Sequence, residues 1–132
     1  MSNFDRMKEI LDKQKQQHII DGPLPVSVRK DWINRCISSL IKYQNEIADA
    51  ISEDFGHRSK ESSLLSDVAG SITSLKMARE NIDKWTKPEK RKVSPSILGF
   101  LGAKLKIEYQ PLGTVGVISP WNFPVTLTFG PL

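Results

Sequence analysis

The sequence predicts an α/β protein in which helices dominate the first two thirds and strands begin only toward the carboxyl end. Two stretches, residues 28–55 and 64–85, place apolar side chains three and four residues apart, which is the spacing of one helical face. The period then changes, because residues 105–109 alternate apolar and polar side chains and residues 115–118 form a short unbroken apolar run. Helices followed by such a run indicate that an α/β domain begins near Gly113.

The predicted helices have recognisable ends. A first, lightly anchored helix is expected over residues 4–17, and the Gly-Pro-Leu-Pro sequence that follows breaks it. Ser27 is the predicted cap of the long second helix, and Gly56 ends that helix because glycine adopts the left-handed conformation most readily. Ser59 can cap a third helix, which closes before Pro88.

The predicted strands lie in the last quarter of the chain. Residues 94–102, with a Ser-Pro step and two glycines, are typical of an irregular connector. Residues 105–109 are expected to form a half-exposed strand, since their apolar side chains alternate with charged ones. After a turn at 111–113, Val115–Ile118 is expected to be a strand buried on both faces.

Charge and composition exclude several classes of protein. Nineteen Lys and Arg against fifteen Asp and Glu give a net charge of +4, and residues 76–106 carry nine basic and three acidic groups. The densest run, residues 87–92, lacks interleaved aromatics, so we interpret it as a solvated linker and expect no nucleic-acid partner. One cysteine excludes an internal disulfide framework and fits a reducing compartment, so the cytoplasm is the default location. The sequence contains no apolar stretch of about 18 residues, so no membrane-spanning helix is predicted.

The two histidines and the one cysteine of the chain are poor candidates for a metal site or a catalytic residue. His18 and His57 lie 39 residues apart with no partner at metal-ligand spacing, so no metal site is predicted. Cys36 shares the apolar helical face with Trp32 and Leu40. We therefore expect Cys36 to be a small buried hydrophobic residue and not a nucleophile.

One segment, Tyr109–Pro124, combines features that point to chemistry. A predicted strand leads into a rigid turn, in which Pro120 and Pro124 fix φ on either side of a Trp-Asn-Phe sequence. Ligands of open α/β sheets bind just beyond the carboxyl ends of strands, so the amide of Asn122 is well placed to donate a hydrogen bond to a developing oxyanion. Spacing alone equally allows a Pro-rich turn with a packed tryptophan.

The same segment, with the sequence YQPLGTVGVISPWNFP, closely resembles the aldehyde dehydrogenase superfamily. The match runs over about sixteen positions, and the resemblance covers roughly residues 27–132. Residues 54–59, the basic stretch after Trp85 and residues 129–132 resemble the coniferyl aldehyde dehydrogenase branch. The fold class implied is aldehyde dehydrogenase-like α/β, with the first strands of an oligomerisation sheet and of a Rossmann-like cofactor-binding sheet.

The resemblance also implies an activity. Members of the family oxidise an aldehyde, here a coniferyl-type or other hydrophobic aldehyde, to the carboxylic acid through a cysteine thiohemiacetal, with NAD or NADP as the cofactor. Asn122 would be the side-chain oxyanion donor. The nicotinamide side of the cofactor cleft would be lined by Ile118, Ser119, Pro120 and Trp121. A homo-oligomer is implied as well.

Apolar spacing and chain breaks make residues 1–25 an amino-terminal helix and linker and 26–103 a helical segment. The resemblance implies that 104–112 is a strand of the oligomerisation sheet and that 113–132 is the start of the NAD(P)-binding domain. The family's nucleophilic cysteine and general-base glutamate follow the Pro-Trp-Asn segment, and this sequence ends eight residues after Pro124. The chain therefore resembles an amino-terminal piece of such an enzyme, expected to be inactive alone. The alternative is a self-contained helical interaction module that uses its basic connector to bind an acidic partner.

Overall fold

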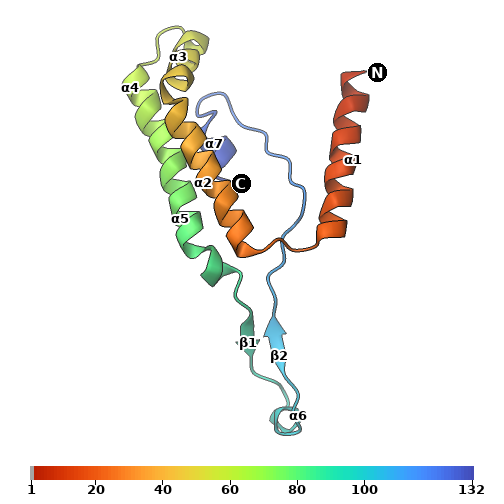
Figure 1. The fold of residues 1–132 in the computed structure, drawn as a ribbon. Coiled ribbons are helices and arrows are strands. Elements are labelled where there is room, and N and C mark those ends of the chain that lie inside the picture. The colour runs from red at the N-terminus through yellow and green to blue at the C-terminus, as the bar shows by residue number, and fades with distance from the viewer. Residues whose placement is uncertain (1) are drawn as a thin grey trace. The chain divides into compact units, whose positions relative to one another are not determined.

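The computed structural model describes residues 2–132, and the chain divides into two compact units whose elements are labelled in Figure 1. One unit joins Leu24–Glu80 to Val115–Leu132, so two distant parts of the sequence fold together. The other joins the residues up to Pro23 to Asn81–Thr114. The main hydrophobic cluster and the segment that contains Asn122 both belong to the unit formed by Leu24–Glu80 and Val115–Leu132.

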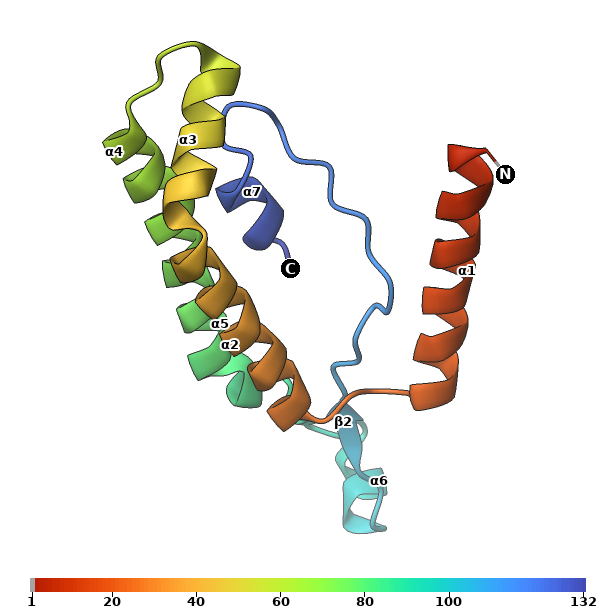
Figure 2. The ribbon, with the colours of Figure 1, turned by 45° about the horizontal axis from the view of Figure 1, so that its top comes forward.

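Two consecutive helices, α2 (Val26–Lys42) and α3 (Gln44–Phe55), replace the single helix predicted over residues 28–55 (Figure 2). The interruption lies at Tyr43, where φ is −103° and ψ is 15°. Helical hydrogen bonding resumes at once, because the amide of Ile47 donates to the carbonyl of Tyr43. No glycine or proline marks this position, which is why the apolar period alone did not predict the break.

The ends of the helices around residue 56 are confirmed. Gly56 lies in the left-handed region with φ 60° and ψ 51°, and it ends α3. Ser59 Oγ accepts a hydrogen bond from the amide of Ser62 at 3.2 Å and caps α4 (Lys60–Ser63). This helix continues through η1 (Leu64–Ala69), a π-helical turn, into α5 (Gly70–Trp85). The sequence predicted one regular helix here, so the π-helical turn is an unpredicted feature.

The hydrophobic core of this unit lies between α2 and α5. Ile37, Leu40 and Leu75 are buried, and Leu40 is only 2% exposed. The half-buried residues that pack against them are Ile33, Cys36, Ile47, Ile72, Val125 and Phe129. Cys36 packs against the core as predicted, although it is half-buried where burial was expected. The last of these residues ends α7 (Thr126–Phe129), a short helix that covers the core.

The strand predicted over Val115–Ile118 is not formed, and this prediction of a cofactor-sheet strand was wrong for the structure. These residues make no ladder, and the side chain of Ile118 is 98% exposed where burial on both faces was expected. A strand is stable only beside a partner strand. Within residues 2–132 the two strands that form pair with each other, so Val115–Ile118 has no neighbour to extend.

The second unit begins with α1 (Asn3–Asp21), which confirms and lengthens the first predicted helix. A capping box starts it: the amide of Asp5 donates to Ser2 Oγ at 3.1 Å, and the amide of Ser2 donates to Asp5 Oδ2 at 2.9 Å. Hydrogen bonds from the hydroxyl and the amide of Ser2 lower the pKa of Asp5. No side chain of α1 is buried, in agreement with a lightly anchored helix.

An antiparallel hairpin completes this unit. Its strands, β1 (Glu89–Arg91) and β2 (Leu105–Ile107), pair with Lys90 opposite Lys106. The predicted strand at 105–109 is thus confirmed over three residues. The basic run is not the linker that was predicted, since part of it forms β1, and the expected irregular connector contains a short helix, α6 (Ser96–Phe100).

Candidate active site

The Pro-Trp-Asn turn, defined as residues 120–124, lies on the surface of its unit. Trp121 is 88% exposed, and Asn122 is exposed beside it. The residues flanking the turn are tied together: the hydroxyls of Ser119 and Thr128 contact each other, and Thr128 Oγ1 donates to the carbonyl of Pro124 at 2.5 Å. The turn therefore presents its central side chains to solvent while its two ends are held.

A buried carboxylate holds the residues that follow the turn. Asp67, in η1, is 0% exposed. Its Oδ1 accepts hydrogen bonds from the backbone amides of Val125 at 3.1 Å and Thr126 at 3.4 Å. Hydrogen bonds to an ionised acceptor are stronger than neutral ones, so Asp67 is a firm attachment for the start of α7.

The hydroxyl of Thr126 adds a second attachment. Thr126 Oγ1 donates to the carbonyl of Ser66 at 2.6 Å, and the carbonyl of Asp67 lies 3.0 Å away. The close approach depends on Gly70, because a Cβ at that position would lie only 3.1 Å from Thr126 Oγ1. A glycine at the first residue of α5 therefore allows α7 to lie directly against the helix.

Arg58 connects the buried carboxylate to the turn itself. Its Nη1 donates to the carbonyl oxygen of Asn122 at 2.5 Å, and its Nη2 lies 3.1 Å from Asp67 Oδ2. The guanidinium carbon also lies 5.1 Å from the ring centre of Phe123 and 5.4 Å from that of Phe55. The Arg58 side chain is 16% exposed, so the ion pair is largely shielded from water.

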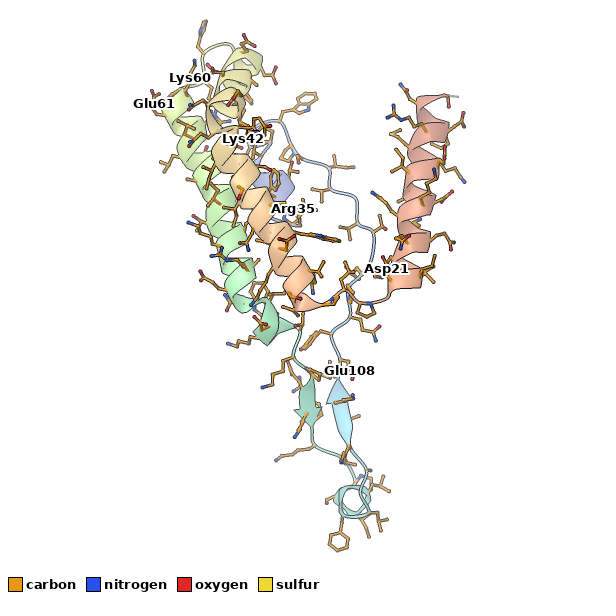
Figure 3. The ribbon with its side chains drawn as sticks, viewed as in Figure 1. Asp21, Arg35, Lys42, Lys60, Glu61 and Glu108 are labelled. Carbon is orange, nitrogen blue, oxygen red and sulfur yellow. The ribbon has the colours of Figure 1, made fainter. Side chains whose placement is uncertain are left out.

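The connection that leads to Arg58 is itself held in place. His57 has a φ of 117°, a strained value for a residue with a side chain. Lys60, at the start of α4 in Figure 3, lies 2.7 Å from Asp49 Oδ1, which joins α4 to α3. The hydrogen bond to Asp49 raises the pKa of Lys60. The helices on both sides of Arg58 are thereby linked.

Sequence reasoning missed this anchor, although the sequence contains a signal for it. Ser63, Asp67 and Ser71 are spaced four residues apart and are all 0% exposed. Ser71 Oγ donates to the carbonyl of Asp67 at 2.5 Å. A polar row at helical spacing beside an apolar face predicts buried hydrogen bonds, because unpaired buried polar groups are costly. Asp67 and Ser71 meet this expectation, whereas the buried Ser63 Oγ has no hydrogen-bond partner among the described residues. Sequence analysis predicted the helix end at Gly56 and the cap at Ser59, and it noted a resemblance for residues 54–59, but it assigned no role to Arg58.

The predicted cofactor residues differ in their exposure to solvent. Ile118 and Trp121 are exposed, whereas Ser119 is half-buried. Two surface hollows, one along α1 and one bounded by residues 49–60, include none of the residues 118–122. What the structure does bring together is Asn122 with Arg58, through the contact at the Asn122 carbonyl.

Residues 2–132 contain neither a grouped set of metal-ligating side chains nor a helix suited to a membrane. Within residues 2–132, no three or more His, Cys, Asp and Glu side chains are grouped so as to hold a metal ion. None of the helices in these residues combines the length and apolar character needed to cross a membrane.

Comparison with known sequences identifies the class of protein to which the chain belongs. A sequence model of the aldehyde dehydrogenase family matches residues 7–132, and the chain belongs to that family. A probable coniferyl aldehyde dehydrogenase of Caulobacter vibrioides is 56% identical over 126 residues, which cover 96% of this chain and 26% of that protein. The coniferyl aldehyde dehydrogenase of a Pseudomonas species is 47% identical over 128 residues, which cover 97% of this chain and 26% of that protein. The chain thus spans about a quarter of the length of these relatives.

Proposed function

We propose that this chain supplies the oxyanion-binding turn of an NAD(P)-dependent aldehyde dehydrogenase that converts a coniferyl-type or other hydrophobic aldehyde to its carboxylic acid. Family membership and the names of the two relatives support this reaction. The observation that carries the proposal is the exposed Asn122 in a turn whose backbone is bound to a buried ion pair.

The proposed role of Asn122 is to donate a hydrogen bond from its side-chain amide. When a nucleophile adds to the aldehyde carbon, the carbonyl oxygen becomes negatively charged. A donor already fixed at the place where that charge develops stabilises the transition state without reorganising. The hydrogen bond from Arg58 to the Asn122 carbonyl at 2.5 Å supports such preorganisation, since it fixes the backbone that bears the amide.

The residues beside the turn fit one side of a nicotinamide site in their chemistry. Ile118 and Trp121 present exposed apolar surface suited to a flat ring, and Ser119 and Pro120 join them. Bound NAD or NADP would accept a hydride from the substrate. We assign no residue to the cofactor phosphates. As part of the same proposal, residues 104–112 contribute an oligomerisation strand and residues 113–132 begin the cofactor domain of a homo-oligomer.

The 132-residue chain alone is expected to oxidise no aldehyde. Its one cysteine, Cys36, packs half-buried against the Ile37–Leu40–Leu75 cluster, so it is not available as a nucleophile. Incubation of the pure chain with coniferyl or benzyl aldehyde and NAD or NADP should give no reduced cofactor by absorbance. Turnover that the Cys36→Ser variant abolishes would contradict both this expectation and the assigned role of Cys36.

The oxyanion role is tested in a complete dehydrogenase that contains this segment. Asn122→Ala should lower kcat by roughly 10²–10³, the usual effect of removing one oxyanion donor, and change KM little. Asn45→Ala, at an exposed position of α3, is the matched control and should leave both constants unchanged. A change in KM alone for Asn122→Ala would refute the role.

The alternative of a helical interaction module gains no support from the basic run. Part of that run forms β1, and there Arg91 pairs with Glu89 within the hairpin. One basic side chain of the run is therefore paired within the hairpin, whereas Lys87, Lys90 and Lys92 are exposed. Binding of the pure chain to an acidic peptide would be the observation that revives the alternative.

A further inference from the structure

Arg58 contacts the Pro-Trp-Asn turn at Asn122, the residue that the proposed function makes the oxyanion donor. One nitrogen of its guanidinium donates to the Asn122 carbonyl at 2.5 Å, and the other donates to Ser66 Oγ and Asp67 Oδ2, both at 3.1 Å. The planar guanidinium holds these donors in a fixed fork. The carbonyl of Asn122 is therefore placed relative to a buried carboxylate through a single rigid group.

The surroundings of Arg58 restrict its movement. The guanidinium lies against the rings of Phe55 and Phe123, and the latter ring belongs to the turn. The residue before Arg58 has the strained φ of 117°. Strained backbone persists where the surrounding contacts over-determine it and is frequent at functional sites. The ring contacts and the hydrogen bonds restrain the same side chain.

The second oxygen of the carboxylate completes the arrangement. Asp67 Oδ1 accepts from the amides of Val125 and Thr126, whereas Asp67 Oδ2 faces Arg58. The backbone is thus bound both at Asn122 and three residues later. Because Asp67 is 0% exposed, the carboxylate to which both backbone positions are bound lies in the interior of the unit and not at its surface.

We infer that Arg58 is a positioning residue for Asn122: by binding the Asn122 carbonyl while paired with Asp67, it fixes where the Asn122 amide points. This inference rests on the proposed oxyanion role of Asn122. Arg58 itself touches neither substrate nor cofactor in this scheme. Lysine cannot replace it, because an ammonium group is a point charge without the fork that spans both acceptors.

The first test uses the 132-residue chain and needs no activity. In Arg58→Lys, hydrogen exchange at the amides of Val125 and Thr126 should stay slow, because Asp67 still accepts from both. The NMR signals of the Asn122 side-chain amide and of the Phe123 backbone amide should shift or broaden. Arg79→Lys is the matched control, because the guanidinium of Arg79 donates a hydrogen bond of 2.8 Å to Asn34 Oδ1 and not to the turn. The Arg79→Lys variant should leave the Asn122 and Phe123 signals unchanged. Unchanged Asn122 and Phe123 signals in Arg58→Lys would overturn the inference.

The second test is a double-mutant cycle in a complete dehydrogenase that contains this segment. Arg58→Lys should lower kcat by about 10–100-fold, since a displacement of about 1 Å can cost 10²-fold, with little change in KM. If Arg58 acts through Asn122, the Arg58→Lys/Asn122→Ala double variant should lose no more than Asn122→Ala alone. If the loss of kcat in the double variant equals the product of the two single losses, the positioning role is refuted. If Asn122→Ala itself keeps full kcat, the proposed function fails instead, and the NMR result still decides whether Arg58 orders the turn.

Discussion

Replacing Asp67 by alanine should destabilise the unit that contains it more than any other single change at the candidate site. The carboxylate accepts from the Val125 amide at 3.1 Å and pairs with Arg58 at 3.1 Å, and it is 0% exposed. Each charge-assisted hydrogen bond contributes about 1.5–3 kcal/mol to stability. Removing one partner of a buried pair costs about 3–5 kcal/mol.

The structure places the expected loss at the lower end of that range. Arg58 keeps 16% exposure and its contacts with Ser66 and Asn122, so its charge is not left wholly unpaired. We therefore expect Asp67→Ala to lower the free energy of unfolding by about 3 kcal/mol. Asp67→Asn keeps an oxygen for Val125 but turns an NH₂ toward Arg58, so it should lose most of the ion-pair contribution.

The assay is denaturant unfolding of the chain, followed by circular dichroism at constant pH and salt. Asp54→Ala is the matched control, because Asp54 is an exposed aspartate in the last turn of α3 and its loss should change stability by less than about 0.5 kcal/mol. A midpoint for Asp67→Ala equal to that of the control would refute the reasoning. It would mean that the carboxylate is hydrated and makes no net contribution.

Two further predictions concern other contacts of the described residues. Gly70→Ala should gain about 1 kcal/mol of helix propensity, but it places a Cβ 3.1 Å from Thr126 Oγ1. Because this Cβ crowds α7, hydrogen exchange at the α7 backbone amides should become faster. Unchanged exchange would show that α7 moves aside without cost. Tyr109 Oη donates to Glu89 Oε1 at 2.5 Å, and this hydrogen bond raises the pKa of the phenol by stabilising its neutral form. Glu89→Gln should therefore lower the pH at which Tyr109 ionises, as measured by tyrosinate absorbance, and an unchanged titration would contradict the contact.

The features that could be predicted from the sequence are those that neighbouring residues determine. Gly56 ends a helix and Ser59 starts one through contacts within four residues, and both were predicted correctly. The strand at Val115–Ile118 was predicted wrongly, because an apolar run shows preference for a sheet interior but not whether a partner strand is present.

The anchor of the candidate site was missed for a related reason. The turn itself was identified from its prolines and its resemblance to a family, yet the contact from Arg58 to Asn122 joins residues 64 positions apart. The contact from Asp67 to Val125 joins residues 58 positions apart. The four-residue spacing of Ser63, Asp67 and Ser71 marks a buried polar row in the sequence, but neither long-range pairing leaves such a trace, so only the three-dimensional structure shows what Asp67 binds.

The π-helical turn determines where the length of this region can vary. Between Lys60 and Trp85 the helical path contains η1, where the amide of Gly70 bonds to the carbonyl of Leu65, five residues back. A π-helical turn holds one residue more than an α-helical turn, so deleting one residue from Leu64–Ala69 should favour a continuous α-helix and keep the residues beyond it on their present faces. Ser71 and Leu75 would then stay buried, as each is now. A deletion within α5 after Gly70 has no such turn to absorb it and would rotate the rest of the helix by about 100°.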